Sequence, residues 1–336
     1  MSLKHLYETK YKKLLWIPFI MLLLAFVQIG MQYQATGDFV NKGISLKGGS
    51  TITIDYVPSI TPDALQSFLD QKFPQADISV RTLGSAGQPA AYAVDSDAQA
   101  SAEIDNLISI INQKIPLTKN NYNVEVVGSS LGDSFFQQTA KALLVAFILM
   151  GIVVFWIFSK DTKFKVICTI LGIIAAFIIL GGNDSPLQIV AYIIAIALFV
   201  IYYQKNIPSF AVVLAAFSDI VITVAIFNLT GIKLSTAGIA AFLMLIGYSV
   251  DTDILLSNKV LKRKEGTLME RIYSSMRTGL TMSFTTIFAV AIAVIFVKSD
   301  TVKQIMIILL IGLIVDIIMT YIQNVGILRL YLEKKK

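Results

Sequence analysis

Five ionisable side chains lie within or beside long apolar runs of this sequence, where they could take part in proton transfer. They are Asp219, Asp251, Asp253, Arg277 and Asp316. An ionisable group is costly inside a bilayer, so it usually faces a protein interior or a water path. Asp219 and Asp316 lie deep in their runs, whereas Asp251 and Asp253 lie toward one end, where a carboxylate can be hydrated. Arg277 precedes the next run, and its ordinary role would be that of an interfacial anchor.

Buried acids on neighbouring helices, with an arginine at the entrance, form the arrangement expected of a proton relay. A conformational change that moves a cation toward or away from a buried carboxyl alters the affinity of that carboxyl for protons. The same groups can instead hold helices together through buried hydrogen bonds. The residues alone leave these two interpretations evenly balanced.

Other kinds of chemistry have little support in the sequence. The one cysteine, Cys168, has no partner for a disulfide, and the one histidine, His5, lies in a charged N-terminal tail. Metal sites built from His and Cys clusters and a Ser/His/Asp triad are therefore excluded. An intramembrane aspartyl protease using Asp219 and Asp251 would need a Gly-x-Gly-Asp motif, which the sequence lacks. We predict no enzymatic activity, no cofactor and no metal site.

The elements that must position these residues are membrane-spanning helices. Of the 336 residues, 55% are hydrophobic and only 15% are charged, which is far from the balance of a soluble domain. A span needs roughly 20 mostly apolar residues. Eight runs meet this requirement, near residues 14–30, 139–158, 164–181, 186–203, 209–229, 235–256, 279–297 and 302–324.

The distribution of Lys and Arg predicts the orientation of the spans, because positively charged loops stay in the cytoplasm. With eight spans, most basic residues fall on one side: the N-terminal tail, the connections near 160 and 205, the loop 257–278 and the C-terminus. The opposite side has few basic residues, namely Lys233, Lys298 and Lys303. Both termini are thus predicted to be cytoplasmic, and the segment 31–138 to be extracytoplasmic.

The segment 31–138 has the polar composition and the turn residues of a water-exposed domain. STITIDYV alternates as a strand, and Pro62 opens a helical stretch that Thr61 can cap. Two further strands, DISVRTLG and PAAYAVDS, surround a glycine-containing turn, and an amphipathic helix and the strand NYNVEVV follow. The order β-α-β-β-α-β predicts a ferredoxin-like domain.

Several motifs together resemble one family. IGYSVDTDILLSNKVLKR, preceded by FSDIVIT and followed by MRTGLTMSFTTIFAV, is similar to the membrane-domain signature of SecF, of the archaeal type in particular. KGISLKGGST resembles the entry to the SecF outer domain. This family belongs to the resistance-nodulation-division (RND) superfamily. The resemblance implies a SecD-like subunit, the Sec translocon (a SecY-type channel), translocating polypeptide and the lipid bilayer as partners, with no nucleic acid. In bacteria the family is powered by the proton-motive force, so the resemblance implies coupling to that force, although the sequence does not identify the coupling ion.

The resemblance also assigns roles to single residues. Asp219 matches the acidic position of a DVIIT-like motif, and Arg277 matches the arginine before the following span. Asp251 and Asp253 straddle the family's Asn-Asp-Thr position, so the resemblance does not decide between them. At Asp316 the family usually has a small residue.

The chain departs from the six-span family pattern in an apolar hairpin at about 163–204, which we expect to pack at the periphery. The predicted architecture is a polytopic α-helical membrane protein of the RND type with one external ferredoxin-like α+β domain. Its predicted parts are a cytoplasmic tail and first span (1–30), the extracytoplasmic domain (31–138), the helix bundle (139–330) and a cytoplasmic tail (331–336). The alternative function is that of a stand-alone or self-associating RND-type proton-coupled transporter.

Overall fold

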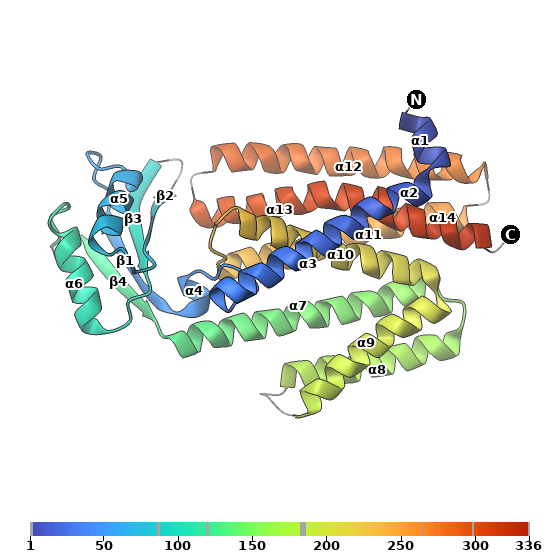
Figure 1. The fold of residues 1–336 in the computed structure, drawn as a ribbon, viewed down its shortest axis with the longest axis horizontal. Coiled ribbons are helices and arrows are strands. Elements are labelled where there is room, and N and C mark those ends of the chain that lie inside the picture. Colours follow the sequence, from blue (N-terminus) through green and yellow to red (C-terminus); the bar gives the residue numbers. More distant parts are fainter. Residues whose placement is uncertain are drawn as a thin grey trace.

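The protein consists of a long bundle of helices with a small sheet domain at one end (Figure 1). The computed structural model describes residues 3–85, 88–118, 121–181, 186–263, 265–297 and 299–334. Both described chain ends lie at the end of the bundle opposite the sheet domain (Figure 1). We call these two ends the domain end and the terminal end. Four of the basic residues on which the predicted orientation depends, Lys264, Lys298, Lys335 and Lys336, lie outside the described parts.

Eight helical segments of the described chain are long and apolar enough to cross a membrane, as the sequence predicts. The first joins α2 (Tyr11–Leu14) and α3 (Trp16–Thr36), and the short helix α1 (Leu3–Thr9) precedes it. The others are α7 (Ser129–Phe158), α8 (Thr162–Gly181), α9 (Pro186–Lys205), α10 (Ile207–Leu229), α11 (Thr236–Lys262), α12 (Leu268–Phe296), and a last segment formed by α13 (Asp300–Ile318), a π-helical turn η1 (Met319–Asn324) and α14 (Val325–Lys334).

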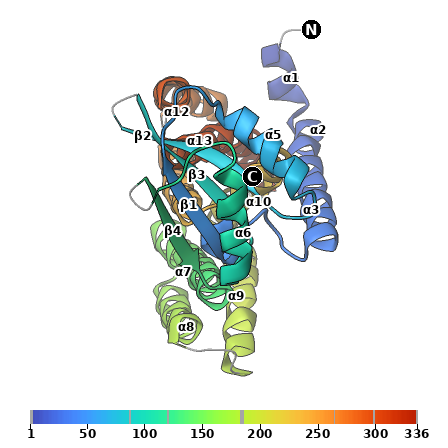
Figure 2. The ribbon, with the colours of Figure 1, turned by 90° about the vertical axis from the view of Figure 1, so that its left-hand side faces the viewer.

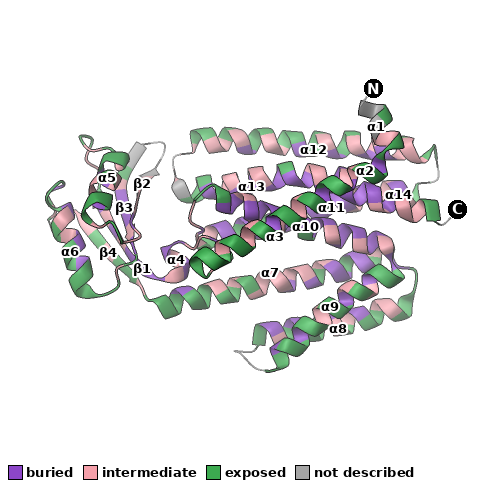
Figure 3. Ribbon diagram, in the orientation of Figure 1, coloured by how far each residue is buried: buried purple, intermediate pink, exposed green. Residues whose placement is uncertain are grey.

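Helices α10 and α11 form the centre of the bundle. In the most apolar stretch of α10, 67% of the residues are buried, and in that of α11, 56% are buried. The corresponding share is 17% for the first span, which contains α3, and 17% for α12 (Figure 3). α13 packs on both central helices, α3 and α7 pack on α10, and α12 packs on α11 and α13. The bundle therefore encloses α10 and α11, and any ionisable side chain on their inner faces is shielded from lipid.

The hairpin α8–α9 lies at the periphery of the bundle, as expected from the sequence (Figure 1). α8 packs on α7, and α9 packs on α8 and α10. Its contacts are mainly apolar, with Phe155 of α7 stacked on Tyr202 of α9 at a ring distance of 5.1 Å. A β-carbon at Gly151 of α7 would lie 3.0 Å from the ring of Tyr202, so this glycine lets the ring of Tyr202 lie against α7.

The sheet domain has the element order β-α-β-β-α-β. It comprises β1 (Gly49–Asp55), α5 (Pro62–Lys72), β2 (Ser79–Ser85), β3 (Gln88–Ser96), α6 (Ser101–Ile111) and β4 (Tyr122–Val127). The four strands are antiparallel in the order β2-β3-β1-β4. Both helices lie on the face of the sheet turned away from the bundle (Figure 2).

Local sequence accounts for these elements. The Thr61 hydroxyl accepts a hydrogen bond from the Ala64 amide at 3.3 Å, and Pro62 begins α5, which is the predicted cap. Alternate residues of β1, Ile52 and Ile54, are fully buried against the helices, where they meet Leu65 and Leu69 of α5 and Leu107 of α6, among others. The period of two along the strand thus places one apolar face on the domain core.

Candidate functional site

Three helices each place one carboxyl group in the interior of the bundle. Asp219 of α10 and Asp253 of α11 are 0% exposed, and Asp316 of α13 is 1% exposed. We call these three residues the acid cluster. Asp316 interacts electrostatically with both of the others, so the three form one group. The central position of α10 and α11 explains this placement, because their inner faces have no access to lipid.

Hydroxyl groups of α11 bind two of these carboxyls. Ser249 Oγ donates a hydrogen bond to Asp219 Oδ2. One turn further along α11, Thr252 Oγ1 lies 3.2 Å from Asp316 Oδ2 and 2.8 Å from the carbonyl oxygen of Ser249. Since a hydroxyl has only one proton to donate, Thr252 can satisfy the carboxyl or the carbonyl, not both.

The π-helical turn η1 supplies the remaining partners. Thr320 Oγ1 donates to Asp316 Oδ1 at 3.1 Å, and Asn324 Nδ2 donates to Asp253 Oδ1 at 2.8 Å. Gln323 Nε2 donates to the hydroxyl of Ser218, the neighbour of Asp219, at 3.1 Å. π-Helical turns inside α-helices are rare and are often found at functional sites. In this chain the turn directs the two amides, Gln323 and Asn324, into the cluster.

The hydrogen bonding of the cluster is incomplete. Asp219 Oδ1 and Asp253 Oδ2 are buried and have no hydrogen-bond partner among the described residues. None of the ion pairs in the described parts of the chain reaches any of the three carboxyls. The described residues also contain no group of three or more His, Cys, Asp or Glu side chains placed to hold a metal ion. The site is thus a set of carboxyls that needs protons or water.

Comparison with known proteins places the chain in a family. A family model described as "Protein export membrane protein SecD/SecF, C-terminal" matches residues 108–183 and 182–334. The protein-export membrane protein SecF of Pyrococcus furiosus is 34% identical over 335 residues, which is 100% of this chain and 96% of that protein. The chain belongs to the SecD/SecF family.

Other members of the SecD/SecF family match along most of the chain as well. SecF of Methanocaldococcus jannaschii is 32% identical over 336 residues, covering 96% of this chain and 96% of that protein. Among solved structures, the crystal structure of SecDF from Thermus thermophilus matches with a TM-score of 0.58 and 16% identity. It covers 97% of this chain and 38% of that SecDF chain, so the present chain has the fold of part of a longer SecDF polypeptide.

The two remaining residues that the SecD/SecF resemblance singles out, Asp251 and Arg277, lie apart from the acid cluster. Asp251 is exposed, because two residues along α11 turn its side chain away from that of Asp253. Arg277 is also exposed, on α12, and forms none of the ion pairs found among the described residues. Burial thus distinguishes Asp253 from Asp251, where the sequence left the choice open, and the roles of both residues stay predictions.

Sequence reasoning missed the polar partners of the acids. They are Ser218, Ser249, Thr252, Thr320, Gln323 and Asn324, and all six are buried. A signal was present, since Thr320 and Asn324 follow Asp316 at intervals of four and eight residues, which places them near one face of a helix. A run of amide and hydroxyl side chains beside a buried acid therefore marks the inner face of a span.

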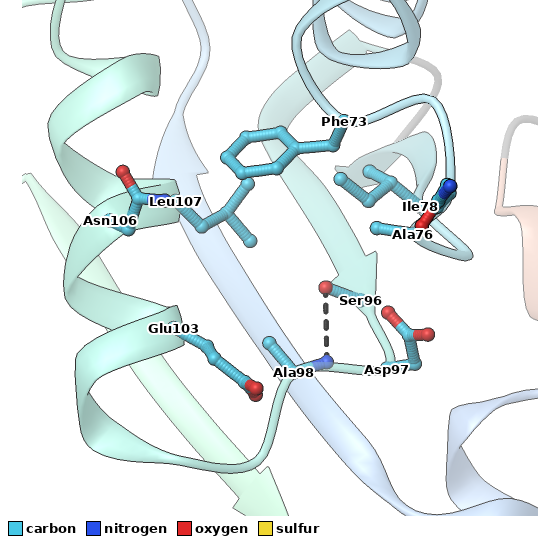
Figure 4. A pocket seen from close by; sticks show the side chains of 10 residues that line it. Phe73, Ala76, Ile78, Ser96, Asp97, Ala98, Glu103, Asn106 and Leu107 are labelled. Carbon is cyan, nitrogen blue, oxygen red and sulfur yellow. Dashed lines mark hydrogen bonds between the residues drawn. The ribbon is translucent and has the colours of Figure 1, made fainter.

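The sheet domain contains a second candidate site, a cavity of about 360 Å³ (Figure 4). Phe73, Ile78 and Leu107 form its apolar wall, between the end of α5 and the side of α6. Two acids at its edge are already engaged, since Glu103 accepts from the two amides that directly precede α6 and Asp97 accepts from the amide of Asp77. The cavity therefore offers mainly apolar contact.

Proposed function

We propose that this chain is a SecF-type subunit that works with a SecD-like subunit to assist protein export through the Sec translocon. The observation that carries this proposal is the match to SecF proteins along nearly the whole of both chains. The match to 38% of a SecDF chain supports the need for a partner that provides the rest. The surfaces for the SecY-type channel and for the exported polypeptide belong to the same proposal.

We propose that both termini are cytoplasmic and that the domain end faces the outside of the cell membrane. The excess of Lys and Arg in the loops and tails of the terminal end supports this orientation. The sheet domain would then be the extracytoplasmic ferredoxin-like domain at 31–138. Its antiparallel order β2-β3-β1-β4, with two helices on one face, supports the ferredoxin-like assignment.

Export is coupled to proton movement through the acid cluster in this proposal. An ionised aspartate at the centre of a spanning helix costs about 3 kcal/mol on the scale of translocon insertion. Three ionised carboxyls side by side without a cation are less favourable still, because like charges repel and burial opposes ionisation. The cluster must therefore bind protons or admit water, and a change in protonation changes which helix arrangement is favoured.

The turn η1 gives the cluster a way to move helices. Asn324 donates to Asp253, and Thr320 donates to Asp316, so the turn touches two of the three acids. Conversion of a π-helical turn to α-helix rotates and lengthens the helix that contains it, because an α-helix rises more per residue, and proton binding at either acid alters the hydrogen bonds that hold the turn. Arg277 and Asp251 remain candidates for the water path that supplies the protons.

Asp219→Asn tests the proton coupling. We expect the variant to assemble normally and to lose proton-driven export, measured as secretion of a reporter protein from cells that depend on the variant. Asp253→Asn should have the same effect, and Asp105→Asn, which removes an exposed carboxylate of α6 in the sheet domain, provides a matched control. Normal export by Asp219→Asn would refute the coupling.

Affinity purification from the native membrane tests the partnership. Recovery of a SecD-like subunit with the tagged chain is the expected result, identified by mass spectrometry. Recovery of the chain alone or as a self-oligomer would instead favour a self-associating transporter of the RND type.

A further inference from the structure

The polypeptide enters and leaves the sheet domain at one point. β1 begins at Gly49 directly after α4 (Ile44–Lys47), and α7 begins at Ser129 directly after β4. A β-carbon at Gly48 would lie 2.6 Å from the amide nitrogen of Ser129, so the two connections lie against each other. Gly48 and Gly49 both have positive φ angles, 85° and 143°, which favour glycine. Two adjacent connections of this kind form a single attachment, about which the domain can rotate as about a hinge.

A carboxylate on the sheet domain makes a further attachment to the bundle, beside this hinge. Asp77 lies in the turn between α5 and β2, the turn that also lines the cavity of Figure 4. Its Oδ2 is paired with the ammonium group of Lys47 and its Oδ1 with that of Lys233. Lys233 is one of the few basic residues that the sequence places on the outer side, and the acid cluster does not use it.

The loop that contains Lys233 is built onto the three helices of the acid cluster. α10 ends at Leu229 and α11 begins at Thr236, so the loop joins these two helices. Gln304 of α13 closes it, since its Oε1 accepts from the Ser235 amide at 3.1 Å and its amide donates to the Lys233 carbonyl. The loop therefore changes position when α10, α11 or α13 changes position.

We infer that Asp77 is a positioning residue that holds the hinged sheet domain onto the ends of the three helices of the acid cluster. We call its two ion pairs the Asp77 latch. The latch would serve the proposed export role, and in this respect the inference rests on that role. Movement of the helices would reach the sheet domain through Lys233. Partly exposed ion pairs are individually weak and are screened by salt, so the latch can open and close.

The charge of Asp77 suits a latch that stays closed at neutral pH. Partial burial opposes ionisation, but the ammonium groups of Lys233 and Lys47 outweigh it and hold the pKa of Asp77 below its ordinary value. The groups facing it are Lys47 of α4, Lys233 of the α10–α11 loop and Asp97, which accepts from the Asp77 amide at 3.3 Å. The ordinary pKa of Asp is about 3.9. The latch should therefore be fully formed above that value and be lost only as the pH falls through the lowered pKa.

Pulsed electron paramagnetic resonance on the full chain in lipid nanodiscs tests the latch. One spin label replaces Gln113 after α6 and the other replaces Leu229 at the end of α10, both exposed residues, in a Cys168→Ala background. For the chain with the unaltered latch, the expected result is a single narrow distribution of distances between the two labels. For Asp77→Asn, the expected distribution is broader. Asp77→Glu, which keeps the charge, should restore the narrow distribution. Asp105→Asn removes an exposed carboxylate of α6 and serves as the matched control.

Two further measurements need no substitution in the latch. Raising the ionic strength to 1 M shortens the Debye length to about 3 Å and should broaden the distribution of the unaltered latch, but not that of Asp77→Asn. Lowering the pH from 7 to 5 should change neither. Identical distributions for Asp77→Asn and the unaltered latch would overturn the inference, as would opening between pH 7 and 5. Because the readout needs neither a SecD-like partner nor export, failure of the latch is distinguishable from failure of the proposed function.

Discussion

The hairpin α8–α9 and the central helices α10 and α11 are all apolar enough to cross a membrane, yet they pack in opposite ways. The most apolar stretches of α8 and α9 are 28% and 22% buried, against 67% and 56% for α10 and α11. In a bilayer an apolar side chain gains little by leaving lipid for protein, so apolarity does not determine which helix is central. Buried polar groups do, because lipid cannot satisfy them.

The distribution of polar side chains follows this difference. The central helices, α13 and η1 together contain all three members of the acid cluster and the hydroxyl and amide groups that bind them. In the described part of the hairpin no carboxyl is buried, and large residues such as Phe177 face outward, at 77% exposure. The central helices are thus fixed by specific hydrogen-bond partners, whereas the hairpin is held mainly by apolar packing.

The largest difference in the free energy of unfolding between the central helices and the hairpin is expected when an aromatic ring is deleted from each. Phe242 of α11 is 3% exposed and lies 6.5 Å from the ring of Phe227 in an edge-to-face arrangement. Phe242→Ala should destabilise the protein by about 3 kcal/mol, near the lower limit for a buried phenylalanine, because the unfolded helix keeps the ring in lipid. Phe177→Ala should change the stability by less than about 0.5 kcal/mol. Unfolding in mixed detergent micelles measures both, and equal effects would refute the comparison.

A methyl group added at a packed glycine should also change the free energy of unfolding differently in the bundle around η1 and in the hairpin, but by less than deletion of a ring. A β-carbon at Gly279 of α12 would collide with the hydroxyl of Tyr321 in η1, whereas one at Gly172 of α8 meets the flexible end of Ile152. Gly279→Ala should lower the free energy of unfolding by about 1–3 kcal/mol. Gly172→Ala, in which Ile152 can move aside, should be nearly neutral. A larger loss of stability in the hairpin variant would contradict the view that the hairpin is loosely fitted.

The smallest difference is expected for single hydrogen bonds. Asn324→Leu removes the donor to Asp253 and should cost about 1 kcal/mol, since hydrogen bonds between spanning helices contribute about 0.6 kcal/mol on average. In the hairpin, Thr169→Val removes the acceptor of the Trp156 indole, a bond of 2.7 Å at an exposed site. Its effect should be smaller than that of Asn324→Leu. A double-mutant cycle between Asn324 and Asp253 isolates the coupling, and a coupling of zero would show that the bond contributes nothing.

Much of the fold follows from local patterns in the sequence. The eight spans are long apolar runs, and the cap of α5 by Thr61 is a local signal that the structure confirms. The order of strands and helices in the sheet domain was also predicted, because alternation and amphipathicity are properties of neighbouring residues. The peripheral position of the hairpin in the bundle was expected because its spans have no ionisable residue deep in the apolar run.

The candidate site was predicted only in part, because the sequence gives residue type but not direction. Asp219 and Asp316 were expected to be buried and are. Asp251 and Asp253 are the same residue type two positions apart, so the sequence does not distinguish them. Only the rotation of α11 against α13 and η1 buries Asp253 and exposes Asp251. The π-helical turn has no signature in single-residue patterns, so the roles of Thr320 and Asn324 were not foreseen.

The sequence by itself determined that the chain spans a membrane, where its ionisable residues lie along the spans, and which family it resembles. These are local properties, set by length, polarity and motif. Only the tertiary structure decided which carboxyls meet and that Asp77 binds Lys47 and Lys233. Such meetings depend on the relative rotation of packed helices and on the path of the chain, and residues more than 150 positions apart have no local pattern that joins them.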